Sequence, residues 1–150
     1  MSSSLVTAVA GLGSLAVGGL YVAFSWRVMP RLAALPTPVA AATMQDLNRR
    51  VERAPFLSAF FGTAALSAAV LWQDRGLAAT GSIAYLAGFA MTLAYHVPRN
   101  TRLARVDAAS PAAGPVWLDY LTEWTRANTV RAALSVGGGI ALLVSSATSP

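Results

Sequence analysis

Four long stretches of this chain contain no charged residue, and they constrain its fold more than any other feature. They cover residues 2–26, 54–73, 76–98 and 132–150. Each is about as long as the roughly 20 apolar residues that a membrane-spanning helix needs, and the apolar residues do not alternate as in a membrane β-strand. The pattern predicts an all-α integral membrane four-helix bundle in a single domain. Its spans are expected near residues 4–27, 54–73, 77–98 and 129–147.

The overall composition agrees with a lipid environment. Charged residues make up 11% of the 150 residues, against about 25% in soluble domains. The net charge of +5 comes from dispersed arginines, without the basic run typical of nucleic-acid-binding proteins. We therefore expect the bilayer to be a partner and nucleic acid not to be one.

The arginines are distributed unevenly between the two sides of such a bundle. Ten of the eleven fall between spans one and two or between spans three and four, and only Arg75 lies on the other side. The positive-inside rule assigns the Arg-rich segments to the cytoplasm. We expect a multi-pass protein of the cytoplasmic (inner) membrane with both termini outside. The first span has no Arg or Lys before its apolar core, which argues against a cleaved signal peptide.

Both Arg-rich segments are long enough to contain helical extensions of the bundle. Apolar residues recur at helical spacing over residues 39–53, which predicts an amphipathic cytoplasmic helix. A helical face that begins at Trp117 continues into the fourth span, so this span is expected to project into the cytoplasm as one long helix. The third helix is expected to end or bend at Val97, because Pro98 lacks an amide hydrogen and disfavours helix before it.

Small residues recur four positions apart in three of the spans. They are Ala10, Ser14 and Gly18; Ala84 and Gly88; and Ser135 and Gly139. Such stripes let membrane helices approach closely. The stripes leave open whether these contacts lie within one chain or between copies in a homo-oligomer.

Polar and aromatic residues gather at the predicted cytoplasmic mouth of the bundle. His96, the only histidine, lies on a packing face of span three with Asn100 nearby, and polar groups at this depth are often functional. The alternative is a histidine that bonds only to the backbone. One face of the fourth helix carries Trp117, Tyr120, Trp124, Asn128 and Arg131. It predicts either a pocket for a flat aromatic molecule, with Arg131 stabilising an oxyanion, or an interfacial aromatic belt with a snorkelling Arg. Ser25, Met29 and Asn48 are expected around the same mouth.

Several chemistries are excluded or disfavoured by what the sequence does not contain. The absence of Cys excludes disulfides and Fe–S clusters, and no cluster has the spacing of a zinc or di-iron site. No Gly-rich phosphate loop is present. The spans contain no Asp or Glu, which argues against a proton-coupled exporter. We expect no metal and no cofactor.

Three motifs in order along the chain resemble a four-helix membrane family of formerly unknown function that includes the anthrone oxygenases. They are FSWRVMP at 24–30 with MQDLNR at 44–49, HVPRN at 96–100, and the Trp-Tyr-Trp-Asn-Arg face of the fourth helix. The resemblance covers most of the chain. His96 stands where the family more often has Asn, which leaves open whether it is a base or a hydrogen-bonding substitute.

Characterised members of that family oxidise an anthrone to an anthraquinone without metal or flavin. The resemblance therefore implies a cofactor-independent monooxygenase that acts on an anthrone-like or other hydrophobic polyphenol, with O2 as co-substrate. An electron-rich carbanion can reduce O2 itself, so the protein need only promote deprotonation, stabilise the anion and exclude water.

On this hypothesis His96 is the general base, and Arg131 and Asn128 hold the developing oxyanion. The candidates for substrate binding are Ser25, Met29, Asn48, Phe60, Tyr85, Asn100, Trp117, Tyr120 and Trp124. The alternative is a non-catalytic binding or assembly module whose aromatic mouth holds a lipid, a quinone or a partner helix.

Overall fold

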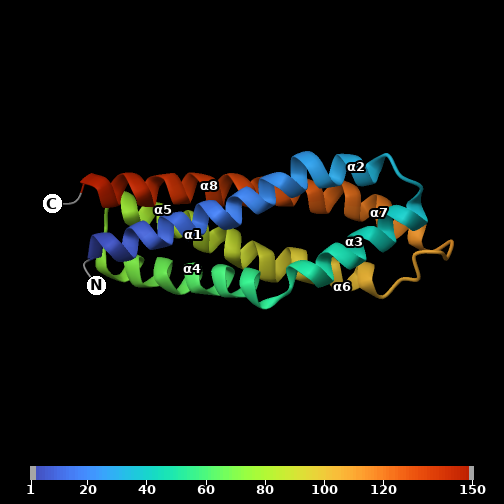
Figure 1. The fold of residues 1–150 in the computed structure, drawn as a ribbon, viewed down its shortest axis with the longest axis horizontal. Coiled ribbons are helices and arrows are strands. Elements are labelled where there is room, and N and C mark those ends of the chain that lie inside the picture. Colours follow the sequence, from blue (N-terminus) through green and yellow to red (C-terminus); the bar gives the residue numbers. More distant parts are fainter. Residues whose placement is uncertain (1–2, 149–150) are drawn as a thin grey trace.

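Four long helices lie side by side in the computed structural model, which describes residues 3–148 (Figure 1). The long helices run over Ser3–Ala33, Ala54–Gln73, Leu77–Ala104 and Ala113–Thr148. Each is long and apolar enough to cross a membrane, and the described residues contain no strand. The predicted all-α fold with four membrane-spanning helices is confirmed.

Three of the long helices contain a π-helical turn between two α-helical parts. The first consists of α1 (Ser3–Ala23), the π turn Phe24–Val28 and α2 (Met29–Ala33). The third consists of α5 (Leu77–Met91), the π turn Thr92–His96 and α6 (Val97–Ala104). The fourth consists of α7 (Ala113–Asp119), the π turn Tyr120–Trp124 and α8 (Thr125–Thr148). The second long helix is α4 (Ala54–Gln73), and the shorter α3 (Thr37–Val51) lies between α2 and α4 in the chain.

Two of these π turns end two residues before a proline, at Val28 before Pro30 and at His96 before Pro98. A proline ring crowds the carbonyl four residues earlier and lacks the N–H that would bond to it. Before Pro98, the amide of Val97 bonds to the carbonyl of Thr92, five residues back. This wider turn leaves room for the ring. The third helix therefore does not end at Val97 but continues to Ala104. The same arrangement precedes Pro30.

The small residues of the predicted stripes lie where helices meet. A Cβ placed on Gly139 of α8 would lie 2.9 Å from the carbonyl oxygen of Gly11 on α1. One turn away, the Ser14 hydroxyl of α1 donates a 2.6 Å hydrogen bond to the carbonyl of Ser135 on α8. The close helix contacts that the stripes predict are thus made within the chain.

The two ends of the bundle differ in composition. Both termini lie at one end, and α2, α3, α6 and α7 lie at the other (Figure 1). Ten of the eleven arginines belong to these helices, to their connections or to the first two turns of α8, and this end is called the Arg-rich end below. The predicted amphipathic helix 39–53 corresponds to α3, which buries Ala40, Ala41 and Met44.

Neighbouring glycines on α8 test how tightly the bundle is packed. A Cβ on Gly138 would lie 2.7 Å from the backbone oxygen of Gly81 on α5, whereas a Cβ on Gly137 would meet nothing within 4 Å. We expect Gly138→Ala to lower the free energy of unfolding by about 1–3 kcal/mol, because the backbone of α5 must move away. Gly137→Ala is the matched control and should not destabilise the protein. Denaturant titration in micelles measures both, and equal stabilities would contradict the predicted close approach.

Candidate functional site

A partly open cavity of about 480 Å³ lies among α1, α3, α4, α6, α8 and the three π turns near the Arg-rich end. Its volume is in the range of about 300–1,000 Å³ that small-molecule sites occupy. Aromatic side chains form much of the wall: Tyr21, Phe24, Phe56, Phe60, Phe61 and Trp124. The other polar side chains in the lining are Asn48, Glu52, Thr92, Asn100, Thr101 and Arg131. An apolar cavity with a few polar groups suits a hydrophobic ligand that carries oxygen substituents.

Each of the three π turns contributes at least one side chain to this cavity. These side chains are Phe24, Thr92, Leu93 and Trp124. Such turns occur often at functional sites, because they change the direction in which side chains leave the helix. The sequence reasoning missed all three turns. The signal that could have indicated two of them is a proline, Pro30 or Pro98, inside an otherwise continuous apolar helix.

Arg131 is a buried cation in the cavity lining. Its side chain is 6% exposed. Its Nε donates to Asn128 Oδ1 at 2.8 Å, and one terminal nitrogen donates to Thr92 Oγ1 at 3.1 Å. The guanidinium carbon lies 3.9 Å from the centroid of the Tyr21 ring, in cation–π contact. Among the described residues, no carboxylate forms an ion pair with it. A ligand in the cavity with a negatively charged oxygen would supply the missing counter-charge.

Asn128 holds Arg131 from outside the cavity. It is fully buried, and its Nδ2 donates to the backbone oxygen of Tyr21 at 2.7 Å and to Ser25 Oγ at 2.8 Å. Its Oδ1 accepts the bond from Arg131. The amide therefore joins α8 to the end of α1 and fixes the plane of the guanidinium. Neither Asn128 nor Ser25 lines the cavity.

Asn100 fixes the aromatic face of the fourth helix. Its Oδ1 accepts hydrogen bonds from the Tyr120 hydroxyl at 2.7 Å and from Trp124 Nε1 at 2.9 Å. Asn48 Nδ2 donates to the same Tyr120 oxygen at 3.3 Å. The rings of Trp117, Tyr120 and Trp124 are stacked and buried, so they form a packed column and not an interfacial belt. Of this column only Trp124 lines the cavity.

His96 lies behind Trp124. The side chain is 1% exposed and does not line the cavity. Its Nδ1 lies 3.2 Å from the backbone oxygen of Met91, and its ring meets Trp124 edge to face at 5.4 Å between centroids. Its Nε2 has no hydrogen-bond partner among the described residues. The backbone bond expected of a structural histidine is present.

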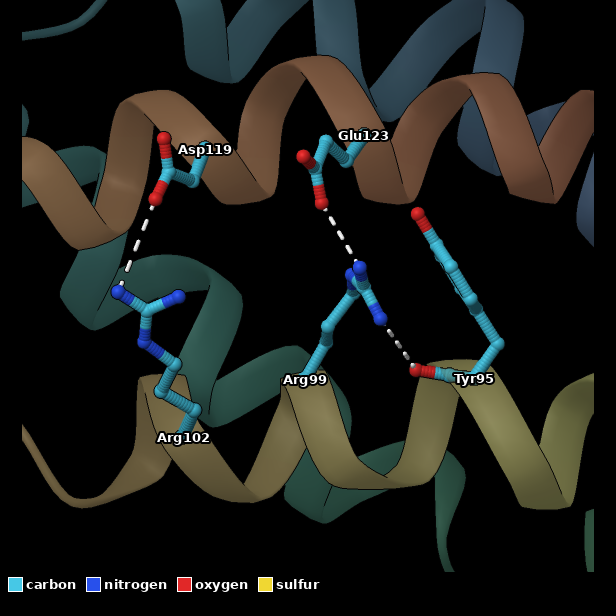
Figure 2. A network of polar contacts seen from close by, with 5 residues as sticks. All are labelled: Tyr95, Arg99, Arg102, Asp119 and Glu123. Atoms are coloured by element: carbon cyan, nitrogen blue, oxygen red, sulfur yellow. Dashed lines mark hydrogen bonds and ion pairs between the residues drawn. The ribbon is translucent and has the colours of Figure 1, made fainter.

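Charged side chains on the outer surface hold α6 against the fourth helix. Figure 2 shows Arg99 paired with Glu123 at 2.8 Å and Arg102 facing Asp119 at 3.6 Å. The Arg99 guanidinium also lies over the ring of Tyr95, 3.4 Å from its centroid (Figure 2). These exposed pairs contribute little energy each. They flank the position of Asn100 and so help keep it in register with Tyr120 and Trp124.

The structure brings together some of the residues that the sequence indicated and separates others from the cavity. Those that line it are Asn48, Phe60, Asn100, Trp124 and Arg131. Those that lie outside its lining are Ser25, Met29, Tyr85, His96, Trp117, Tyr120 and Asn128. Tyr85 supports the wall, since its hydroxyl donates to the backbone oxygen of Phe60 at 2.9 Å. The sequence reasoning did not select Tyr21 or Thr92, although Thr92 lies four residues after Gly88 on the span-three stripe.

Within residues 3–148, no three His, Asp or Glu side chains are grouped so as to hold a metal ion. That the protein uses no metal and no cofactor stays a prediction.

A protein-family model described as anthrone oxygenase matches residues 53–141 of the chain. The chain belongs to the anthrone oxygenase family. Comparison with curated proteins gave no significant match, and neither did comparison with solved structures. In this anthrone oxygenase family member, the matched region contains Asn100, Trp124 and Arg131, whereas Tyr21 and Asn48 lie before it.

Asn128 should contribute more to stability than a typical hydrogen-bonding residue in a membrane protein. We expect Asn128→Ala to lower the free energy of unfolding by about 2 kcal/mol or more, because it removes three bonds and leaves Arg131 Nε unpaired. Thr148→Val, near the end of α8, removes an exposed hydroxyl that bonds only to backbone oxygens of its own helix, and it should cost less than about 1 kcal/mol. Unfolding titrations in micelles compare them. Equal losses would contradict the bridging role of Asn128.

Proposed function

We propose that this protein is a cofactor-independent membrane oxygenase that oxidises an anthrone-like or other hydrophobic polyphenol with O2. The observation that supports this most directly is Arg131, a buried cation in an aromatic cavity that has no carboxylate partner within residues 3–148. A phenolate or enolate oxygen would supply the negative charge. The rings of the same ligand would lie against Phe60 and Trp124, and membership of the anthrone oxygenase family supports this choice of ligand.

The proposed reaction balances with O2 as the only oxidant. Loss of a proton from the central methylene carbon of an anthrone gives an electron-rich enolate, which transfers one electron to O2. The carbon and oxygen radicals then combine and are protonated to a hydroperoxide. Loss of the remaining hydrogen on that carbon as a proton, with O–O cleavage, gives the quinone carbonyl and one molecule of water. The protein lowers the barrier by stabilising the enolate and by excluding bulk water.

Different groups are proposed to act at different stages. Arg131, held in place by Asn128 and Thr92, binds the enolate oxygen, and Asn48 or Asn100 bonds to a second oxygen substituent at the other end of the cavity. His96 remains the candidate general base. Because it lies behind Trp124, a base must reach the substrate through a water molecule or after a movement of that ring.

The decisive test follows O2 uptake and quinone absorbance with purified protein and an anthrone, with and without air. We expect a rate above the spontaneous one that requires O2. Arg131→Gln should lower this rate by about 10²-fold or more, as loss of an oxyanion-stabilising donor does. Arg126→Gln is the matched control, because it removes an exposed arginine from the same helix outside the cavity.

The role of His96 is tested in the same assay. A general base contributes about 10²–10⁴-fold, so His96→Asn should lower the rate by at least 10²-fold if His96 is the base. Undiminished rates in both His96→Asn and Arg131→Gln would contradict the proposed mechanism. Binding of a planar phenol without any O2 uptake would instead favour the non-catalytic binding module.

We also propose that the Arg-rich end faces the cytoplasm, with both termini outside, because ten arginines lie near that end. The chain has no cysteine, so single cysteines report the orientation directly. A membrane-impermeant maleimide added to intact cells should label Gln73→Cys and not Ala104→Cys. The reverse pattern would show the opposite orientation.

A further inference from the structure

We propose that the mouth of the cavity opens sideways into the lipid bilayer, between α4 and the long helix formed by α5 and α6, and that a planar hydrophobic ligand enters there from the lipid. The proposal rests on the proposed function for the class of ligand. It adds a route of entry and the residues that form it.

The rim of the mouth consists of residues that both line the cavity and are exposed on the outside of the bundle. Leu57 is 36% exposed and Phe61 50% on α4; Leu93 is 45% exposed and Val97 43% on the third long helix. Phe60, which lines the same cavity from inside, is 3% exposed. All four rim residues lie on helices long and apolar enough to span a membrane. Their outer sides would therefore contact acyl chains.

The rim changes from apolar to polar towards the Arg-rich end. Leu93, Val97 and Thr101 are spaced four apart along one long helix, and all three line the cavity. One side of the mouth is therefore apolar at Leu93 and Val97 and polar at Thr101. On the other side, Phe61 and Leu57 of α4 are followed towards the same end by exposed Glu52, the residue after α3. The mouth is thus a slit that runs lengthwise, with its apolar part towards the membrane interior.

The two sides of the slit pack against different neighbours. α4 packs against α1 and α5, whereas α6 packs against α3, α7 and the π turn Tyr120–Trp124. The helices α4 and α6 are therefore held by different neighbours, which leaves the space between them for the mouth.

Entry from the lipid is energetically consistent with this chemistry. A neutral polyphenol is concentrated in the bilayer, because transfer of its apolar surface out of water is favourable. It would meet Phe61 and Leu93 without first being returned to water. Once inside, it would meet Arg131, whose charge favours an ionised oxygen. The apolar rim would thus admit the neutral molecule, and the buried cation would favour its anion.

The test uses bulky labels on single cysteines, since the chain has no native cysteine. In the Leu93→Cys variant, benzophenone maleimide attached to the new cysteine places a bulky group at the apolar part of the rim. The Phe61→Cys variant places the same label at a second apolar position. Thr101→Cys carries the same label at the polar part. Ile83→Cys is the matched control, because Ile83 is 55% exposed on α5 and does not line the cavity.

The probe for binding is 1,8-dihydroxyanthraquinone, which quenches tryptophan fluorescence. Protein in phosphatidylcholine vesicles is mixed with vesicles loaded with this probe, and the loss of fluorescence is followed with time. Trp26→Phe and Trp72→Phe remove the two most exposed indoles, so that the fluorescence comes from the buried Trp117 and Trp124. The label at residue 93 or 61 should slow both association and dissociation by about tenfold or more, and by more than it changes the equilibrium constant. The label at residue 83 should change the rates less than about twofold, and the label at residue 101 should slow them less than the labels at 93 and 61 do.

Other outcomes would overturn the lateral route. Slower binding with the label at residue 101, and not at 93 or 61, would show entry from water. An absence of quenching in the unlabelled protein would show that the cavity does not take such a ligand.

O2 uptake by the same labelled proteins, measured with anthrone-loaded vesicles in place of the anthraquinone, separates the two proposals. If the label at residue 93 slows binding but no O2 is taken up, the oxygenase is rejected and the lateral route is kept. If O2 is taken up and only the label at residue 101 slows the oxidation, the lateral route is rejected and the oxygenase is kept.

Discussion

The burial of Arg131 is the constraint on which the rest of the site depends. A guanidinium inside an apolar bundle costs free energy unless its N–H groups are bonded and its charge is compensated. Asn128, Thr92 and the ring of Tyr21 satisfy part of that requirement, and they come from three different long helices. The cation therefore requires α1, α5 and α8 to meet at one depth, and the glycine and serine contacts between these helices make that meeting possible.

The π turns convert continuous helices into the walls of a cavity. Each of them lies inside a long helix, and each supplies at least one lining residue. A regular α-helix would carry its apolar stripe past this depth without interruption, and the stripes would then close on one another. The extra residue in each wide turn shifts the register of the side chains. The helices continue to the Arg-rich end, while Phe24, Thr92 and Trp124 surround a space.

The sequence predicted the features that depend on solvent and on local spacing. Uncharged stretches gave the four helices, and the four-residue stripes gave their packing faces, because both follow from helix geometry and lipid alone. The sequence also indicated that Arg131 and Asn128, three residues apart, lie on one face of the helix. It could not indicate which side of Trp124 faces the cavity, because that depends on the hydrogen bond between Trp124 and Asn100 on another helix. For the same reason, spacing could not tell that His96 lies behind the wall or that Tyr21 lies in it.

The position of Arg131 and the shape of the cavity wall depend on different parts of the fold. The group that recognises charge sits on the glycine-packed helices, where substitutions meet the backbone of a neighbour. Much of the aromatic wall of the cavity lies on α4, with Phe56 and Phe60 one turn apart and Phe61 next to Phe60. These two properties can therefore change independently during evolution. If the proposed function holds, relatives that accept a broader or narrower ring system should differ mainly along α4 while keeping Arg131.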